Sequence, residues 1–190
     1  MGTVHDERRT HEQAAAGREP LARDEFDVLA VEHRGGALRF AIGFLHDRHL
    51  AEDMVQEGLR RLYAARDRYP LRTLFGPYLV KTVARACLDL RRSRTAERRR
   101  IAALPPRVAA PASVPLERSE TAAQVAAAVA ALPDRERACF LLAVCEGVSY
   151  DDAAEALGLS FAQVNNAIHH ARRALRVSLG SLVADEARHP

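Results

Sequence analysis

The stretch SYDDAAEALGLSFAQVNNAIHHARRALR, residues 149–176, predicts two helices joined by a tight turn. Ser149 and Asp152 stand three residues apart at the start of the first helix, the spacing of a capping box that satisfies free backbone N–H groups. Ser160 and Gln163 repeat this spacing at the start of the second helix. The two caps therefore indicate where each helix begins and place the turn between them.

The residues between and after the caps indicate how the two helices pack. Gly158 tolerates the positive φ with which a helix can stop and turn. This pattern is typical of a helix-turn-helix, whose second helix enters the major groove of DNA. An ordinary pair of packed helices can look similar, so both interpretations stay open on this segment alone. The apolar positions that two crossed helices would bury are Ala153, Ala154, Leu157, Leu159, Val164 and Ile168.

The composition of the 190-residue chain favours an all-α fold. Apolar residues make up 48% of the chain, aromatic residues make up 5%, and Trp is absent. Ala and Leu supply much of the apolar content and favour helices, and no segment alternates β-branched or aromatic residues with polar ones as strands do. The length allows one medium domain or two small ones.

The positive charge of the chain is concentrated in one segment. The formal net charge is +3, but residues 81–107 alone carry +7 and the rest of the chain carries −4. A localised basic stretch suggests a polyanionic partner, to which binding would depend on salt. The alternative is that the arginines are only solvated.

The sequence lacks the marks of an enzyme or a metalloprotein. Cys87, Cys139 and Cys145 form no CxxC pair, and we expect them to be buried small hydrophobes in a reducing compartment. The eight histidines lack metal-ligand spacing, and no nucleophile–base pair or phosphate-binding glycine loop is recognisable. We therefore predict no catalytic residue, no metal and no cofactor. Without a signal peptide or a long apolar run, we predict a cytoplasmic protein with no membrane insertion.

The sequence of the first half of the chain predicts a tail followed by helices. Residues 1–22 are polar and predict a flexible tail, and helical periodicity begins at Phe26, with Gly35 and Gly36 either kinking or splitting the helix. Residues 50–68 predict the next helix, whose interior Gly58 costs up to about 1 kcal/mol relative to alanine. Its polar face, which could simply be solvated, carries Asp53, Gln56, Glu57 and Arg60.

The next segment combines aromatic and basic residues. We expect a loop over 71–76 and a helix from Pro77 to about Arg92, which RSRTAERRR, residues 92–100, could prolong. Phe75 and Tyr78 stand beside the loop, and exposed rings next to cations are what single-stranded nucleic acid binding requires. The alternative is that both rings fill the core of a small helical domain. The basic ridge of this helix is formed by Lys81, Arg85 and Arg92.

A Pro-rich stretch separates this half from the second. Pro105, Pro106, Pro111 and Pro115 predict an extended linker over 95–119. Beyond it we expect helices over about 121–132 and 134–146, then the helix-turn-helix and a C-terminal tail. The predicted fold is thus two small helical domains, 23–94 and 120–182, with tails at 1–22 and 183–190.

Three motifs in this order resemble the bacterial sigma factors, specifically the two-domain extracytoplasmic-function group of the sigma-70 family. AEDMVQEGLRRLYAARDRY, residues 51–69, is similar to the region 2.2 helix that docks on the β′ clamp of RNA polymerase. FGPYLVKTVARACLDLRRSR, residues 75–94, is similar to regions 2.3 and 2.4, which open and read the −10 element. LPDRERACFLLAVCEGVSYDDAAEALGLSFAQVNNAIHHARRALR, residues 132–176, is similar to region 4, the −35 reader, which implies a contact with the β flap.

The resemblance implies a non-enzymatic transcription initiation factor that binds core RNA polymerase and promoter DNA and is regulated by an anti-sigma factor. Asp53, Gln56, Glu57 and Arg60 would then dock on the polymerase. The implied −10 residues are Phe75 and Tyr78 for unstacked bases and Lys81, Arg85, Arg91 and Arg92 for the backbone. The implied −35 residues are Ser160, Gln163, Asn165, Asn166 and His169 near the bases and Arg172, Arg173 and Arg176 on phosphates.

The chain departs from the family pattern in places. The family commonly has a Trp near Tyr78 and an Asn near Ala86, and its recognition helix is usually basic where this chain has Asn165-Asn166-Ala167. Two other functions stay open: a stand-alone helix-turn-helix regulator that binds duplex DNA without polymerase, and an enzyme in a small helical fold. Promoter sequence, inducing signal and the redox role of the cysteines do not follow from the residues.

Overall fold

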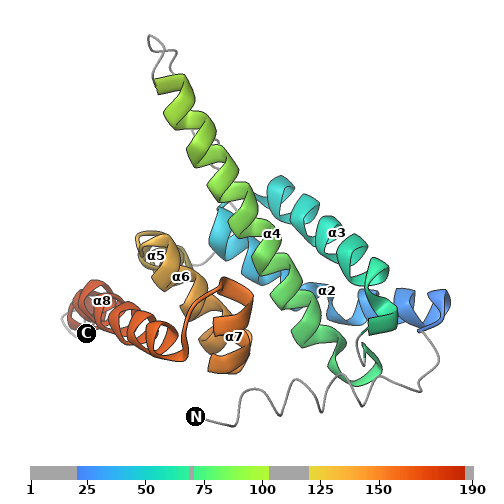
Figure 1. The fold of residues 1–190 in the computed structure, drawn as a ribbon. Coiled ribbons are helices and arrows are strands. Elements are labelled where there is room, and N and C mark those ends of the chain that lie inside the picture. The colour runs from blue at the N-terminus through green and yellow to red at the C-terminus, as the bar shows by residue number, and fades with distance from the viewer. Residues whose placement is uncertain (1–20, 69–70, 103–119, 187–190) are drawn as a thin grey trace.

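The structure of the protein is a computed structural model that describes residues 21–68, 71–102 and 120–186 (Figure 1). Within these ranges the backbone forms helices and no strand, so the predicted all-α fold is confirmed. Most of the predicted N-terminal tail and of the Pro-rich linker lies outside the described residues. We call residues 21–102 the first region and residues 120–186 the second region.

The first region is built from three long helices that pack on one another. They are α2 (Arg23–Leu45), α3 (Arg48–Ala64) and α4 (Leu71–Ala102), with a short 3₁₀ turn η1 (Arg66–Arg68) between the last two. α2 runs without a break through its two central glycines. α3 begins at Arg48 because Asp47 Oδ1 accepts a hydrogen bond from the Leu50 N–H at 3.1 Å.

The helix α4 differs from the sequence prediction at both ends. The expected loop over 71–76 is wrong, because helical structure begins at Leu71 and only Leu74 is non-helical, at φ −125° and ψ 20°. The helix continues past Arg92 to Ala102, which is the longer of the two alternatives and takes it into the first part of the expected linker (Figure 1). Arg and Glu are good helix formers, and Arg100 contacts Glu97 one turn away at 2.8 Å.

The second region contains four α-helices and one π-helical segment. They are α5 (Glu120–Ala130), α6 (Asp134–Phe140), the π-helix η2 (Leu141–Cys145), α7 (Tyr150–Leu157) and α8 (Phe161–Glu186). The helix expected over 134–146 therefore changes to π geometry in its last turns. α8 continues to Glu186, into the first residues of the expected C-terminal tail.

Local signals predicted the turn between α7 and α8 correctly. Gly158 adopts a positive φ of 67° at the end of α7. Ser160 and Gln163 form the predicted reciprocal capping box, with bonds of 3.3 and 2.8 Å. Ser149 Oγ accepts from the Asp152 N–H at 3.1 Å, but the Asp152 carboxylate accepts from the Ser149 hydroxyl rather than from its backbone. The helix-turn-helix geometry is thus present in α7 and α8.

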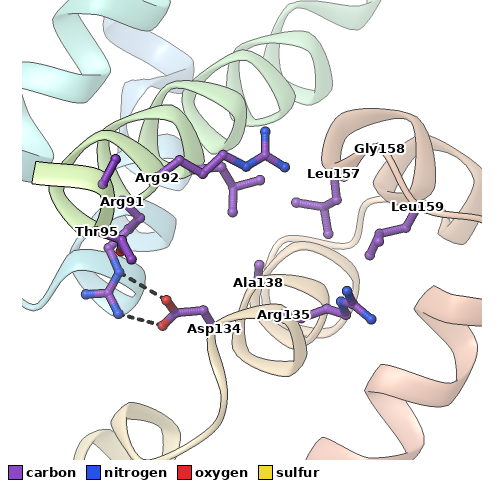
Figure 2. Close-up of a pocket in the computed structure, with 11 residues that line it drawn as sticks. Arg91, Arg92, Thr95, Asp134, Arg135, Ala138, Leu157, Gly158 and Leu159 are labelled. Atoms are coloured by element: carbon purple, nitrogen blue, oxygen red, sulfur yellow. Dashed lines mark hydrogen bonds and ion pairs between the residues drawn. The ribbon is translucent and has the colours of Figure 1, made fainter. Parts of the chain in front are cut away.

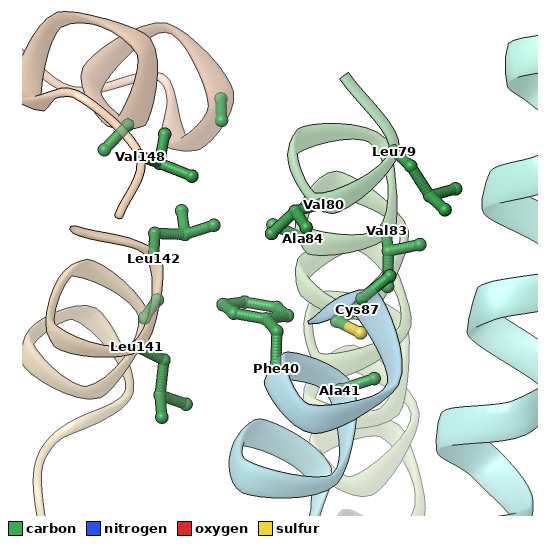
Figure 3. Close-up of a cluster of buried hydrophobic side chains, with 14 of the residues drawn as sticks. Phe40, Ala41, Leu79, Val80, Val83, Ala84, Cys87, Leu141, Leu142 and Val148 are labelled. Carbon is green, nitrogen blue, oxygen red and sulfur yellow. The ribbon is translucent and has the colours of Figure 1, made fainter. Parts of the chain in front are cut away.

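The two regions share one hydrophobic core. Phe40 of α2 and Val80 of α4 face Leu142 of η2 across the boundary, and all three are buried (Figure 3). The buried cluster extends from the first region into α6, η2, α7 and α8. Each large side chain that is fully buried in such a core contributes about 1.5–3 kcal/mol. In this arrangement the two regions therefore form one packed body, although we predicted two separate domains from the sequence.

Gly58 is a point at which α3 and α4 approach closely. A Cβ on Gly58 would overlap Cγ2 of Val83 and would lie 3.4 Å from the Val83 backbone N. Gly58 and Val83 are both buried. The interior glycine that costs helix propensity in α3 therefore permits the packing of α3 on α4, and a larger residue has no space there.

We predict that Gly58→Ala lowers the free energy of unfolding by about 1–3 kcal/mol, because overpacking outweighs the gain in helix propensity. Chemical denaturation followed by circular dichroism measures this change. Gly180→Ala is the matched control, since Gly180 lies in α8 with no atom within 4 Å of the added Cβ, and it should not destabilise. Adding Val83→Ala to Gly58→Ala should recover part of the loss; equal effects of the two glycine substitutions would contradict this account.

Candidate nucleic-acid and protein interfaces

Lys81, predicted to lie on an exposed basic ridge, is buried. Its residue exposure is 7% because α7 packs on this face of α4. Its Nζ lies 2.7 Å from Asp152 Oδ1 and 3.3 Å from Glu155 Oε2, and 5.0 Å from the centre of the Tyr78 ring. The prediction of a freely exposed Lys81 is therefore wrong. Its burial depends on the packing of α7 on α4, two helices that lie far apart in the sequence.

The carboxylates of α7 keep Lys81 charged. Burial alone would lower the pKa of Lys81, but the hydrogen bonds and charges of Asp152 and Glu155 outweigh it and raise that pKa. Burial alone would raise the pKa of Glu155, but the charges and hydrogen bonds of Lys81 and Arg85 outweigh burial and lower that pKa. Lys81 and Glu155 are thus both ionised at neutral pH.

Of the other predicted −10 cations, Arg85 and Arg92 share the face of α4 with Lys81, whereas Arg91 points towards α6. Arg85 is exposed, and its guanidinium lies 3.3 Å from Glu155 Oε1. Arg91 makes a two-point contact with Asp134 at the start of α6, at 2.6 and 3.2 Å (Figure 2). Arg92 is exposed beside a cavity of about 620 Å³ between α4, α6 and the turn after α7, which Arg135 also lines. The ridge therefore exists, but acidic side chains of the second region contact most of it.

The structure also corrects the prediction that Phe75 is available to stack on a base. Phe75 is 1% exposed and packs in the core, with ring centres 5.0 Å from Phe26 and 5.9 Å from His33. The alternative, that this ring fills the core, is the one that the structure supports. Tyr78, one helical turn later, is half-buried and lies at the edge of the ridge next to Lys81.

The predicted polar side chains of α3 lie on one side of the helix and reach the surface. Asp53, Gln56 and Arg60 are exposed, and Glu57 is half-buried between arginines. Glu57 accepts hydrogen bonds from Arg60 at 2.8 Å and from Arg61 at 2.7 Å. These bonds lower the pKa of Glu57 to about 2. Glu57, Arg60 and Arg61 therefore form a linked network of charges, and Asp53 and Gln56 lie on the same face beside it.

The predicted DNA-reading residues lie on the solvent side of α8. Asn165, Asn166 and His169 are exposed, as are Arg172, Arg173 and Arg176 further along the helix. Ser160 and Gln163 are exposed too, but the side chains of both form the cap of α8. Gln163 Oε1 is thus occupied by the Ser160 N–H, which leaves its amide NH₂ for other contacts.

Several residues at the boundary of the regions were missed by the sequence analysis. Arg137 of α6 is 3% exposed; it donates to the Ala130 carbonyl at 2.7 Å, contacts His46 at 2.9 Å and pairs with Asp134. Arg39 of α2 makes a two-point contact with Glu146 at 2.9 and 3.3 Å. His46 and Arg137 are 91 residues apart in the chain, and Arg39 and Glu146 are 107 residues apart. No local pattern marks such pairs.

The cysteines do not share one environment. Cys87 and Cys139 are buried, and burial raises the pKa of Cys87 to about 12 and that of Cys139 to about 11. Cys145 at the end of η2 is exposed, so the expectation that all three are buried is wrong. Among the described residues no group of His, Cys, Asp and Glu could hold a metal ion, and no helix there is long and apolar enough to cross a membrane.

Comparison with protein families gives two matches. Residues 29–97 match the model of sigma-70 region 2, and residues 122–175 match the model of sigma-70 region 4. The two matches cover most of the three-helix first region and most of the second region, including its helix-turn-helix. They occur in the same order along the chain as the three sequence motifs.

Individual proteins agree with these matches. The chain is 32% identical over 161 residues to the ECF RNA polymerase sigma factor SigE of Mycolicibacterium smegmatis, covering 82% of this chain and 62% of that protein. Its fold resembles that of the sigma factor RpoE in complex with the anti-sigma factor NepR from Bartonella quintana, at a TM-score of 0.64 and 22% identity over 83% of this chain and 96% of that one. It also resembles CnrH in complex with the cytosolic domain of CnrY, at a TM-score of 0.59 and 25% identity over 89% and 94% of the two chains.

The network on α3 makes a prediction that acid titration can check. We expect the Glu57 carboxylate to stay ionised down to about pH 2, because Arg60 and Arg61 both donate to it. Carboxyl NMR shifts followed against pH measure the titration directly. Arg60→Ala should raise the pKa of Glu57 towards the ordinary value, whereas the same midpoint in both proteins would show that Arg60 does not hold this carboxylate.

Proposed function

Because the chain belongs to the extracytoplasmic-function group of the sigma-70 family, we propose that it is a transcription initiation factor that directs core RNA polymerase to promoters. Sigma factors are not enzymes, and the catalysis in this reaction belongs to the polymerase. The observation that carries the proposal is the occurrence of both family matches in one chain, each on the helices that the function needs. The proposed site of action is the cytoplasm.

The proposed −35 reader is the outer face of α8. Asn and Gln side chains can form paired hydrogen bonds with adenine in the major groove, so Asn165 and Asn166 are the candidate base readers, with His169 close by. Gln163 is a candidate for a single bond from its amide NH₂, because the Ser160 N–H occupies its Oε1. The arginines at 172, 173 and 176 would contact phosphates and set the register of the helix. Their exposure on one continuous helix supports this division. The Asn-Asn-Ala sequence gives the centre of the face little charge of its own.

The proposed −10 surface is the ridge of α4. Tyr78 is the aromatic candidate for an unstacked base, and Phe75 is left out because it belongs to the core. Lys81, Arg85, Arg91 and Arg92 are the candidate backbone contacts, as predicted from the sequence. The carboxylates that now contact three of them must be displaced before DNA can bind.

The proposed partners on the protein side are core polymerase and an anti-sigma factor. The polar face of α3, formed by Asp53, Gln56, Glu57 and Arg60, would dock on the β′ clamp, and the second region would meet the β flap. An anti-sigma partner is supported by the similar structure in which the sigma factor RpoE is bound to the anti-sigma factor NepR. The rival interpretation, a regulator that binds duplex DNA alone, would require stable promoter binding without polymerase, and a gel shift separates the two.

The docking proposal predicts that Asp53→Arg combined with Glu57→Arg abolishes co-purification with core polymerase. The two substitutions reverse the charge of the face, and the second also sets a new cation against Arg60 and Arg61. Asp27→Arg with Glu32→Arg on the exposed side of α2 makes the same change in net charge and should leave association intact. Unchanged association of the α3 variant, with its helicity preserved, would refute the docking assignment.

The −35 proposal predicts that Arg172→Ala with Arg173→Ala weakens binding of the polymerase complex to all promoters alike. Because two phosphate contacts are lost, the slope of log affinity against log salt should become shallower by about 2. Filter binding or fluorescence anisotropy across a salt series measures it. Arg23→Ala with Arg34→Ala removes the same charge from α2 and serves as the control; a change in promoter preference instead would mean that the α8 arginines read bases.

A further inference from the structure

Phe161, the first residue of α8, is the only exposed Phe or Tyr among the described residues. Its residue exposure is 52%, whereas the other Phe and Tyr residues that the structure describes are buried or half-buried. Single exposed apolar side chains are common on protein surfaces, so exposure alone decides nothing. What distinguishes Phe161 is its position on the helix to which the proposed function assigns DNA binding.

Phe161 lies on the same face of α8 as the candidate DNA contacts. Because a helix turns by about 100° per residue, Asn165 stands about 40° and Arg172 about 20° around the helix axis from Phe161. All three side chains are exposed. The ring of Phe161 therefore extends the row of candidate contacts to the N-terminal end of the helix.

The ring of Phe161 is supported by α7. Its centre lies 5.8 Å from the centre of the Tyr150 ring, and the two ring planes are inclined by 44°. Tyr150 is the first residue of α7 and packs against the core. Helical side chains lean towards the N-terminus of their helix, so the Phe161 ring projects past the start of α8. A ring that already has a partner on one side loses less freedom when a ligand binds the other side.

The N-terminal part of α8 has no lysine or arginine to attract phosphates. Residues 161–171 contain neither, and Arg172 is the first such residue of the helix. Contacts from this part must therefore come from amides, histidines and apolar side chains. The apolar group that a base pair presents in the major groove is the C5-methyl of thymine, and a Phe ring is one of the side chains that contact it.

We propose that Phe161 is a specificity residue of the −35 reader, and that its ring packs against the C5-methyl group of one thymine in the duplex. The inference rests on the proposed function, since it takes α8 to lie in the major groove. In a helix-turn-helix the N-terminal residues of the second helix reach the base edges. Asn165, one turn further along the same face, would then bond to an adenine close to that thymine. The contact selects thymine because the other bases lack this methyl group.

The test uses the full chain bound to core RNA polymerase. The wild-type complex first selects duplexes from a randomised library, and the bound duplexes are sequenced. Each thymine of a selected duplex is then replaced in turn by deoxyuridine, which lacks only the methyl group. Competition binding gives the ratio of the affinities for the thymine and deoxyuridine duplexes, and this ratio does not depend on how much of a variant is folded.

We expect the methyl group of one thymine to strengthen wild-type binding by about fourfold, the gain that burial of one methyl group gives. Phe161→Ala should abolish this preference at that position and leave the ratios at other thymines unchanged. Phe161→Leu, which keeps an apolar side chain, should retain part of it.

Val177→Ala is the matched control. Val177 is 75% exposed on the same helix, but it stands about 160° around the axis from Phe161, so its removal should leave every ratio unchanged. The proposal is overturned if no thymine of the selected duplexes shows a methyl preference, or if the preference persists in Phe161→Ala, even where that variant binds all duplexes more weakly. Failure of the wild-type complex to select any duplex would instead refute the proposed function.

Discussion

A buried ammonium group is the constraint on which the arrangement of the two regions depends. Removing a charged lysine from water costs several kcal/mol unless carboxylates replace the lost hydration. Because the packing of α7 on α4 buries Lys81, this packing requires Asp152 and Glu155 at the Lys81 Nζ. Such pairs add specificity more than net stability. The apolar side chains of Phe40, Leu142 and their neighbours supply the stability of the same boundary.

What the sequence could predict was local. The caps at Ser149 and Ser160 and the turn at Gly158 depend on residues within one helical turn, so their spacing was enough to place α7 and α8. The two faces of α3 follow from helical periodicity for the same reason. The candidate residues of α8 needed only that periodicity to be placed on a solvent face.

The rest depended on contacts between distant parts of the chain. Phe75 and Lys81 have the residue types of a DNA surface, but the first is buried by α2 and the second by α7. Gly58 has a cost within its own helix, and the reason for it is Val83 on another helix. A side chain's type and spacing do not say which helix covers it, and this was the reason for the corrections at Phe75 and Lys81.

The connection between α4 and α5 gives the packing of the two regions a further property. Because residues 103–119 join the two regions in one chain, the partners of every pair at the boundary meet at an effective concentration, which for covalently linked groups is on the order of millimolar. The packing of one region on the other is therefore independent of how many copies of the protein a cell contains. A DNA strand or a protein that binds the same cations must compete with carboxylates of the same chain, which dilution does not remove. The concentration and affinity of that strand or protein therefore decide whether it displaces them.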